Sequence, residues 1–189
     1  MTQHPAVPLW PGSAVTAEVL TAPVRRLLPG EVFVFGSNAG GFHGAGSAGL
    51  ACRGDSGPGW RTDTRFLEMI RAPAGSPARV GEWAVFGVAR GHQVGRTGQS
   101  YAIETIQRPG RQYRRGTPLE VIAGQLRELV AFARSRPDLR FVITPVGEGY
   151  SGYTRAEMGQ VWRRVHEQCG GLPRSFRFVR LAHDERALT

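Results

Sequence analysis

Two kinds of segment follow one another along this chain: short runs that are wholly apolar, and longer stretches that are amphipathic. The first clear run, from Glu31 to Gly36, has four consecutive apolar residues and ends at glycine, which is typical of a strand buried on both faces. Residues 140–144 have the same character. Further strands are expected at 83–88, at 100–105 near the middle of the sheet, and at 175–181. The chain therefore predicts a sheet with several buried strands.

Two stretches have the spacing and the start signals of helices. At Thr117 a Thr-Pro-x-Glu sequence predicts an N-cap, and apolar residues then recur every three or four positions as far as residue 133. The sequence Thr154 to Glu157 repeats the capping pattern before a second helix. A helix of small residues is expected in the second half of 37–51, and a helical turn at 66–70.

Strands that alternate with capped helices indicate an α/β fold with a sheet between helix layers. Residues 1–30 are rich in proline and are expected to form an N-terminal extension, with one short element near 15–20. The domain itself is expected to span 31–189. Residues 54–80, rich in glycine and proline, are expected to form an insertion over the surface.

Composition narrows the possible classes of protein. The 189 residues are 41% hydrophobic and 21% charged, which is typical of a folded domain, and the formal net charge of +9 comes with arginine but no lysine. Such a charge attracts anionic ligands. Cys52 and Cys169 are too few for a disulfide scaffold or a cysteine-rich zinc site. No apolar run is long enough to cross a membrane and no secretory signal is visible, so a cytoplasmic protein is expected.

Two glycine-rich loops carry the strongest chemical signal. One follows the strand at 31–36, the other follows the strand at 140–144, and each leads into a helix. Ligands of open α/β sheets bind where such loops meet, and N–H groups at a helix start can hold a phosphate. Two facing loops would suit a diphosphate, although glycine-rich connections can also be ordinary tight turns. The spacing does not fit a P-loop, and there is no lysine to serve one.

Three motifs resemble those of macrodomains, the ADP-ribose-binding family. They are Val34 to Gly46 (VFGSNAGGFHGAG), Gly98 to Ile103 (GQSYAI) and Val146 to Tyr153 (VGEGYSGY), which occur in the order seen in a small bacterial and phage branch. The resemblance covers about 31–181. It implies a three-layer α/β/α macrodomain with a mixed sheet, in which ADP-ribose lies between the two loops, with no cofactor and no metal.

The resemblance also implies a set of ligand-binding residues. Asn38 would contact the distal ribose, and the remaining contacts would come from Gly41, His43, Gly44, Ala45, Gly46, Gly147, Glu148, Gly149, Tyr150, Ser151, Gly152 and Tyr153. Simpler roles are open for several of them. Asn38 can cap its own turn, and the two tyrosines can anchor the second loop on the core.

The activity expected from this resemblance is that of an ADP-ribosyl hydrolase, which removes ADP-ribose from a modified protein or nucleic acid. Its candidate catalytic residues are Asn38 to orient the ribose, with His43 or Glu148 to handle the proton. A buried His43 and an exposed Glu148 without a role are the alternatives. Ile106 and Ser151 stand where a related branch has a catalytic lysine and aspartate, so that mechanism is not available. The alternative is a reader that binds ADP-ribose without cleaving it.

Two further segments bear on partners. Arg108, Arg111, Arg114 and Arg115 flank a tyrosine and could contact DNA or RNA, or simply form a solvated loop. Asp184, with His183, is a weak candidate for recognition of the adenine amino group. A basic nucleic-acid-binding domain without ADP-ribose affinity is the third possibility.

Overall fold

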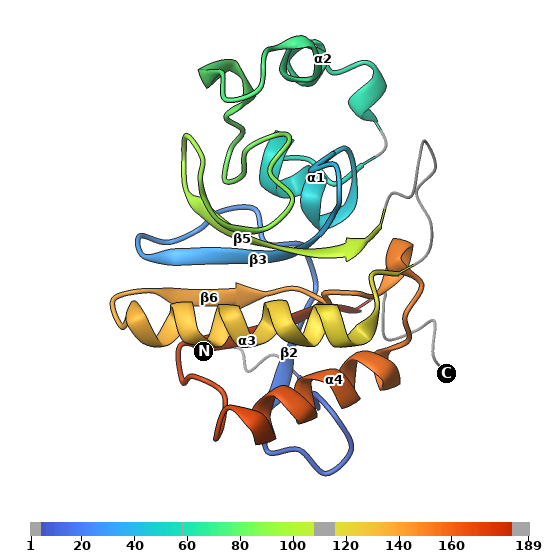
Figure 1. Ribbon diagram of the computed structural model, residues 1–189, viewed down its shortest axis with the longest axis vertical. Coiled ribbons are helices and arrows are strands. Elements are labelled where there is room, and N and C mark those ends of the chain that lie inside the picture. Colours follow the sequence, from blue (N-terminus) through green and yellow to red (C-terminus); the bar gives the residue numbers. More distant parts are fainter. Residues whose placement is uncertain (1–4, 58, 108–115, 183–189) are drawn as a thin grey trace.

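The computed structural model describes residues 5–57, 59–107 and 116–182, and its centre is one mixed sheet. In spatial order the strands run β1-β2-β7-β6-β3-β5-β4 (Figure 1). Their bounds are β1 Ala6–Pro8, β2 Thr16–Leu20, β3 Glu31–Asn38, β4 Gly91–Val94, β5 Gln99–Ile106, β6 Arg140–Ile143 and β7 Phe176–Leu181. The wholly apolar runs occupy the interior of this sheet, as their pattern predicts.

The five strands from β2 to β5 in spatial order are mutually parallel, whereas the edge strands β1 and β4 are antiparallel to their neighbours. Parallel pairing places the ends of β2, β3, β5, β6 and β7 on a single edge, which we call the carboxyl edge. The loops that follow β3 and β6 both start there. This is the edge at which open α/β sheets bind ligands.

Helices cover both faces of the sheet (Figure 1). They are α1 Gly46–Arg53, α2 Thr64–Arg71, α3 Leu119–Ser135 and α4 Arg155–Gln168, with short 3-10 helices η1 Gly59–Arg61, η2 Pro77–Arg79 and η3 Gly149–Ser151. Because side chains alternate along a strand, Val32 and Val34 pack with α3 and α4, whereas Phe33 and Phe35 pack with α1. The expected α/β class, a sheet between two helix layers, is confirmed.

The predicted helix starts had different outcomes. Thr154 caps α4 in a full capping box: its hydroxyl accepts the Glu157 N–H, and the Glu157 carboxylate accepts the Thr154 N–H. The prediction of a cap at Thr117 is wrong. That residue is fully buried, its hydroxyl lies 3.5 Å from Glu104 Oε1, and α3 begins without a side-chain cap. Tertiary contact has displaced the local capping interaction.

Three other expectations need revision. Residues 83–88 form a bend, an isolated bridge at Val85 and a turn, and the strand beside β5 is Gly91–Val94. β5 is second from the edge of the sheet and not central. Residues 6–20, expected as an extended arm, supply β1 and β2, and β2 pairs with β7. The extension thus completes the sheet.

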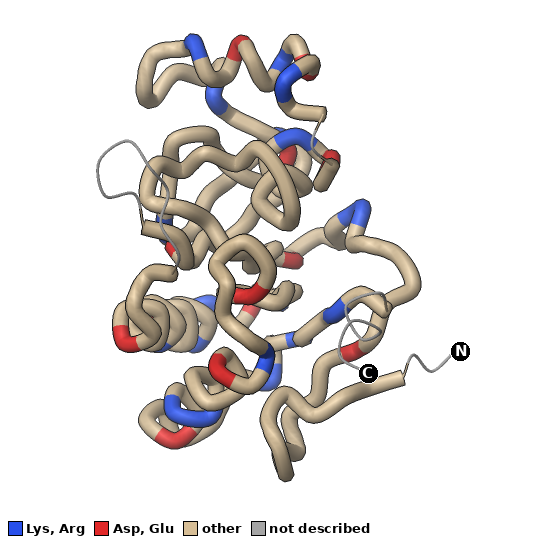
Figure 2. The backbone as a smooth tube through the Cα atoms, turned by 90° about the vertical axis from the view of Figure 1, so that its right-hand side faces the viewer, with Lys and Arg blue, Asp and Glu red and all other residues tan. Residues whose placement is uncertain are grey.

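Charged residues are dispersed over the described part of the chain. Basic and acidic positions are scattered among each other on the side that carries the carboxyl edge (Figure 2). None of the described helices combines the length and apolar character that a membrane crossing requires.

Candidate functional site

A cavity of about 720 Å³ opens at the carboxyl edge, on the face of the sheet that α1 covers. We call it the carboxyl-edge cavity. Its lining comes from the ends of β2 and β7, the start of α1, the loop after β6 and the start of α4. One part is apolar, with Leu20, Pro23, Val24, Phe33, Leu50, Val179 and Leu181, and the other is polar, with Gly46, Ser47, Ser56, Thr144, Glu148, Gly149, Thr154, Arg155 and Arg180. Its volume is in the range of about 300–1,000 Å³ found for small-molecule sites.

The loop after β3 does not line the cavity itself; the start of α1, which follows it, does so at Gly46 and Ser47. Asn38 holds the first part of this loop: its amide donates to the Phe42 carbonyl at 2.7 Å, and its carbonyl oxygen accepts the N–H groups of Gly40 and Phe42 at 3.1 Å. Asn38 therefore caps its own turn. Gly46, at φ +60°, then begins α1 at the cavity wall.

Side chains of the loop after β6 fasten it to the body of the protein. The Ser151 hydroxyl is buried and donates to the Thr105 hydroxyl at 2.7 Å. The Tyr153 hydroxyl donates to the Thr117 carbonyl at 2.8 Å, while the ring lines the cavity. Tyr150 is 84% exposed at the cavity mouth. Ser151 and Tyr153 are thus fixed, and Gly149 and Tyr150 lie in the cavity lining beside them.

Glu148 is neither an exposed residue nor a free base. Its carboxylate accepts two hydrogen bonds from the Arg180 guanidinium, at 2.8 and 2.9 Å, and the two side chains are 18% and 5% exposed. This bidentate pair joins the loop after β6 to β7 at the cavity wall. The hypothesis that Glu148 activates water is not supported by this arrangement, because the carboxylate is already engaged by a cation.

His43 does not face the cavity. It is fully buried, with its ring edge-on to Phe35 and Nε2 3.0 Å from the Ser37 hydroxyl. Burial lowers the pKa of His43 to about 4. The expectation that His43 handles a proton is therefore corrected: the ring is neutral near pH 7 and has no path to a ligand.

The structure brings part of the expected site together. Five of the expected residues line the carboxyl-edge cavity: Gly46, Glu148, Gly149, Tyr150 and Tyr153. The others are outside its lining: Asn38, Gly41, His43, Gly44, Ala45, Gly147, Ser151 and Gly152. Several of these glycines are packing positions. A Cβ on Gly41 would lie 2.4 Å from the Gly87 backbone, and one on Gly147 would lie 2.5 Å from Met158 Sδ.

Sequence reasoning missed Arg180, Ser56 and the apolar part of the cavity. Arg180 stands in an ordinary strand pattern, and nothing near it in sequence pairs it with Glu148. Ser56 lies in the segment between α1 and α2, outside the motifs. Only the sheet order, which sets β2 beside β7, creates the apolar lining from Leu20 and Val179.

Some expectations concern residues outside the described part of the chain, namely Arg108, Arg111, Arg114, Arg115, His183 and Asp184. Among the described residues, no group of three or more His, Cys, Asp or Glu side chains could hold a metal ion.

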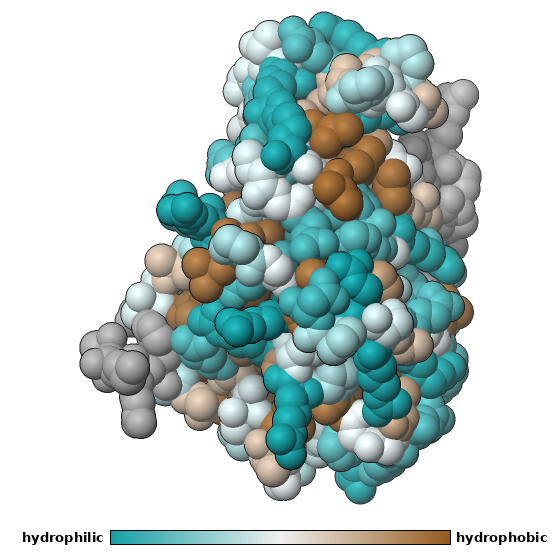
Figure 3. Space-filling view, turned by 90° about the vertical axis from the view of Figure 1, so that its left-hand side faces the viewer, coloured by the Kyte–Doolittle hydropathy of each residue, from teal (hydrophilic) through white to brown (hydrophobic). Residues whose placement is uncertain are grey.

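A second hollow, of about 690 Å³, lies at the opposite edge, where β3 and β5 begin. Arg25 and Arg26 are on its rim, together with Leu28 and Val94, which are 59% and 63% exposed. Figure 3 shows the side of the molecule that carries this edge, with apolar groups surrounded by hydrophilic ones. The glycine-rich loops take no part in its lining.

Comparisons with known proteins give a distant structural likeness. No protein-family model matches the chain, and no curated protein matches it. A solved protein of unknown function from Bacteroides thetaiotaomicron has a TM-score of 0.45 and 11% identity, over 80% of this chain and 85% of that one. A mutant macrodomain from Oceanobacillus iheyensis has a TM-score of 0.44 and 15% identity, over 91% and 87%. At TM-scores below 0.5, neither likeness carries an argument about the site.

Proposed function

We propose that this protein binds ADP-ribose, free or attached to a protein or nucleic acid, in the carboxyl-edge cavity. The observation that carries the proposal is that one cavity is lined both by the start of α1, at Gly46 and Ser47, and by the loop after β6, at Gly149 and Tyr150. These are the two loops whose motifs resemble those of macrodomains.

The diphosphate would lie between these two loops. The first N–H groups of a helix have no partner within it and carry partial positive charge, which favours an anion at the start of α1. Gly149, at φ +70° with open space beside it, allows close approach of backbone from the other side. Two guanidinium side chains, those of Arg155 and Arg180, lie in the polar lining together with Glu148.

The apolar part of the cavity would hold the base. Leu20, Val179 and Leu181 offer a surface without charge beside the polar part, as a ligand with an aromatic ring at one end and phosphates in its middle requires.

Binding without cleavage is the activity that the geometry favours over hydrolysis. Asn38 caps its own loop, His43 is buried, and Glu148 is paired with Arg180, so none of the three candidates is free to activate water. A role as a reader of ADP-ribosylated macromolecules follows from the proposal.

Calorimetric titration with ADP-ribose tests the proposal. The parent protein should bind saturably, and Gly149→Glu should weaken binding at least tenfold by placing bulk and negative charge in the cavity. Gly170→Glu is the matched control, because its φ of +67° and open surroundings match those of Gly149 but it follows α4, away from the cavity. Absence of saturable binding by the parent, or equal binding by both variants, would reject the proposal.

A product assay separates reader from hydrolase. The parent protein is incubated with ADP-ribosylated protein and, separately, with ADP-ribosylated DNA. We expect no release of ADP-ribose above buffer, and catalytic release from either substrate would replace the reader with a hydrolase.

A further inference from the structure

The turn Asp55–Gly57 contributes a third wall to the carboxyl-edge cavity. Its central residue, Ser56, lies in the cavity lining, and its carbonyl oxygen accepts the Gly46 N–H at 2.9 Å. The turn therefore lies directly against the start of α1. It belongs to the segment after α1, outside the motifs that suggested the site.

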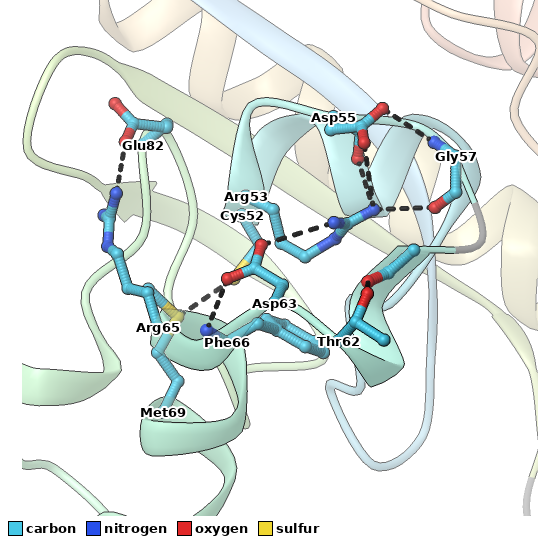
Figure 4. A network of polar contacts seen from close by, with 11 residues as sticks. Cys52, Arg53, Asp55, Gly57, Thr62, Asp63, Arg65, Phe66, Met69 and Glu82 are labelled. Carbon is cyan, nitrogen blue, oxygen red and sulfur yellow. Dashed lines mark hydrogen bonds and ion pairs between the residues drawn. The ribbon is translucent and has the colours of Figure 1, made fainter.

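A buried arginine holds this turn in place (Figure 4). The Arg53 guanidinium donates to the carbonyl oxygens of Asp55, at 3.0 Å, and Gly57, at 2.6 Å, so it binds the residues on both sides of Ser56. The Asp55 carboxylate closes the turn by accepting the Gly57 N–H at 2.9 Å. Asp63, the N-cap of α2, also pairs with Arg53 at 3.3 Å.

The Arg53 side chain that holds this turn is buried, so its partners must compensate for the loss of water. The Arg53 side chain is only 3% exposed, and removing a guanidinium from water is costly unless its partners compensate. These partners are two backbone carbonyl oxygens of the turn and the carboxylates of Asp55 and Asp63. Ser56, which lies between the two carbonyl groups, is itself exposed. Arg53 therefore ties the cavity wall to the start of α2 and to the core residue Phe66, over whose ring its guanidinium lies.

The position of Ser56 determines which ligand group it would meet. Its carbonyl already occupies the Gly46 N–H, so an anion at the start of α1 must use the next amides, beginning with that of Ser47. Among the described residues the hydroxyls of Ser47 and Ser56 have no hydrogen-bond partner. Both are donors on the same side of the cavity.

We propose that Ser56 is a ligand-binding residue whose hydroxyl donates to a phosphate oxygen of the bound diphosphate, and that Arg53 is the positioning residue that holds it there. This inference rests on the proposed binding of ADP-ribose. It assigns a binding role to the segment after α1 and explains why a surface turn is built around a buried cation.

Titration of ADP-ribose into Ser56→Ala tests the contact. Hydrogen bonds to charged groups contribute enough that its loss should raise Kd about tenfold. Ser175→Ala, immediately before β7 and outside the cavity, is the control and should match the parent. If the parent binds and Ser56→Ala binds equally well, the inference is overturned while the proposed function stands. If the parent does not bind, the proposed function itself has failed.

Arg53→Lys tests the positioning role. The guanidinium uses Nη2 for both carbonyl oxygens and Nη1 for Asp63, whereas an ammonium has a single nitrogen for all three partners. We expect Arg53→Lys to raise the Kd for ADP-ribose. The rise should be smaller when the same substitution is made in the Ser56→Ala variant. Additive losses in the double variant would overturn the claim that Arg53 acts through Ser56. Thermal unfolding of each variant reports any general loss of structure, which would lower stability without this non-additivity.

Discussion

The ion pair between Glu148 and Arg180 allows a direct test of how the cavity wall is held. In Arg180→Met the aliphatic volume is largely kept, but the Glu148 carboxylate loses both of its hydrogen bonds from the guanidinium. We expect the free energy of unfolding to fall, because a buried charge without its partner is destabilising.

The size of the effect follows from the burial of the two groups. Loss of one partner of a buried pair costs about 3–5 kcal/mol. Glu148 is 18% exposed and borders the cavity, so water can solvate it in part, and we expect about 3 kcal/mol. For a chain of this length that corresponds to a fall in Tm of about 6–12 °C.

Urea denaturation of the parent, Glu148→Gln, Arg180→Met and the double variant measures the coupling between the two side chains. Because the double variant leaves no unpaired charge, it should be more stable than the sum of the single losses implies, by at least about 1 kcal/mol. Additivity to within about 0.5 kcal/mol would refute the pair as a structural link between the loop after β6 and β7.

Three further outcomes are expected. Burial lowers the pKa of His43 from 6.5 to about 4, so between these pH values the unfolded chain binds a proton that the folded protein does not. The free energy of unfolding should therefore fall by roughly 3 kcal/mol as the pH falls from about 6.5 to 4. Urea titrations of His43→Gln at each pH should lack this decrease, and a pH profile like that of the parent would contradict the prediction. Gly147→Ala, whose Cβ would meet Met158 Sδ at 2.5 Å, should unfold at least about 1 kcal/mol more easily than Gly149→Ala, which has a similar positive φ but open space; equal stabilities would argue against the close packing. Burial raises the pKa of the Cys52 thiol to about 12, so a thiol reagent at pH 8 should modify it only after unfolding, and rapid labelling of the folded protein would show that the site opens.

Much of the scaffold could be predicted because its signals are local. The wholly apolar run at 31–36 specifies a strand buried on both faces, and the Thr154 capping box specifies where α4 begins. Glycine-rich loops after two parallel strands likewise place both loops at one edge, whatever their contacts. The strand predicted at 83–88 was wrong, because a short apolar run does not distinguish a strand from a buried irregular segment.

Tertiary structure alone decided which side chains reach the cavity. Asn38 and His43 lie in the expected loop, but hydrogen bonds within that loop and burial against β3 remove both from the ligand's side. Glu148 meets Arg180 across 32 positions of sequence because β6 and β7 are neighbours in the sheet. Local sequence therefore determined the elements and the edge that bears the loops. Long-range pairing, which no local pattern encodes, determined the charge and shape of the surface between them.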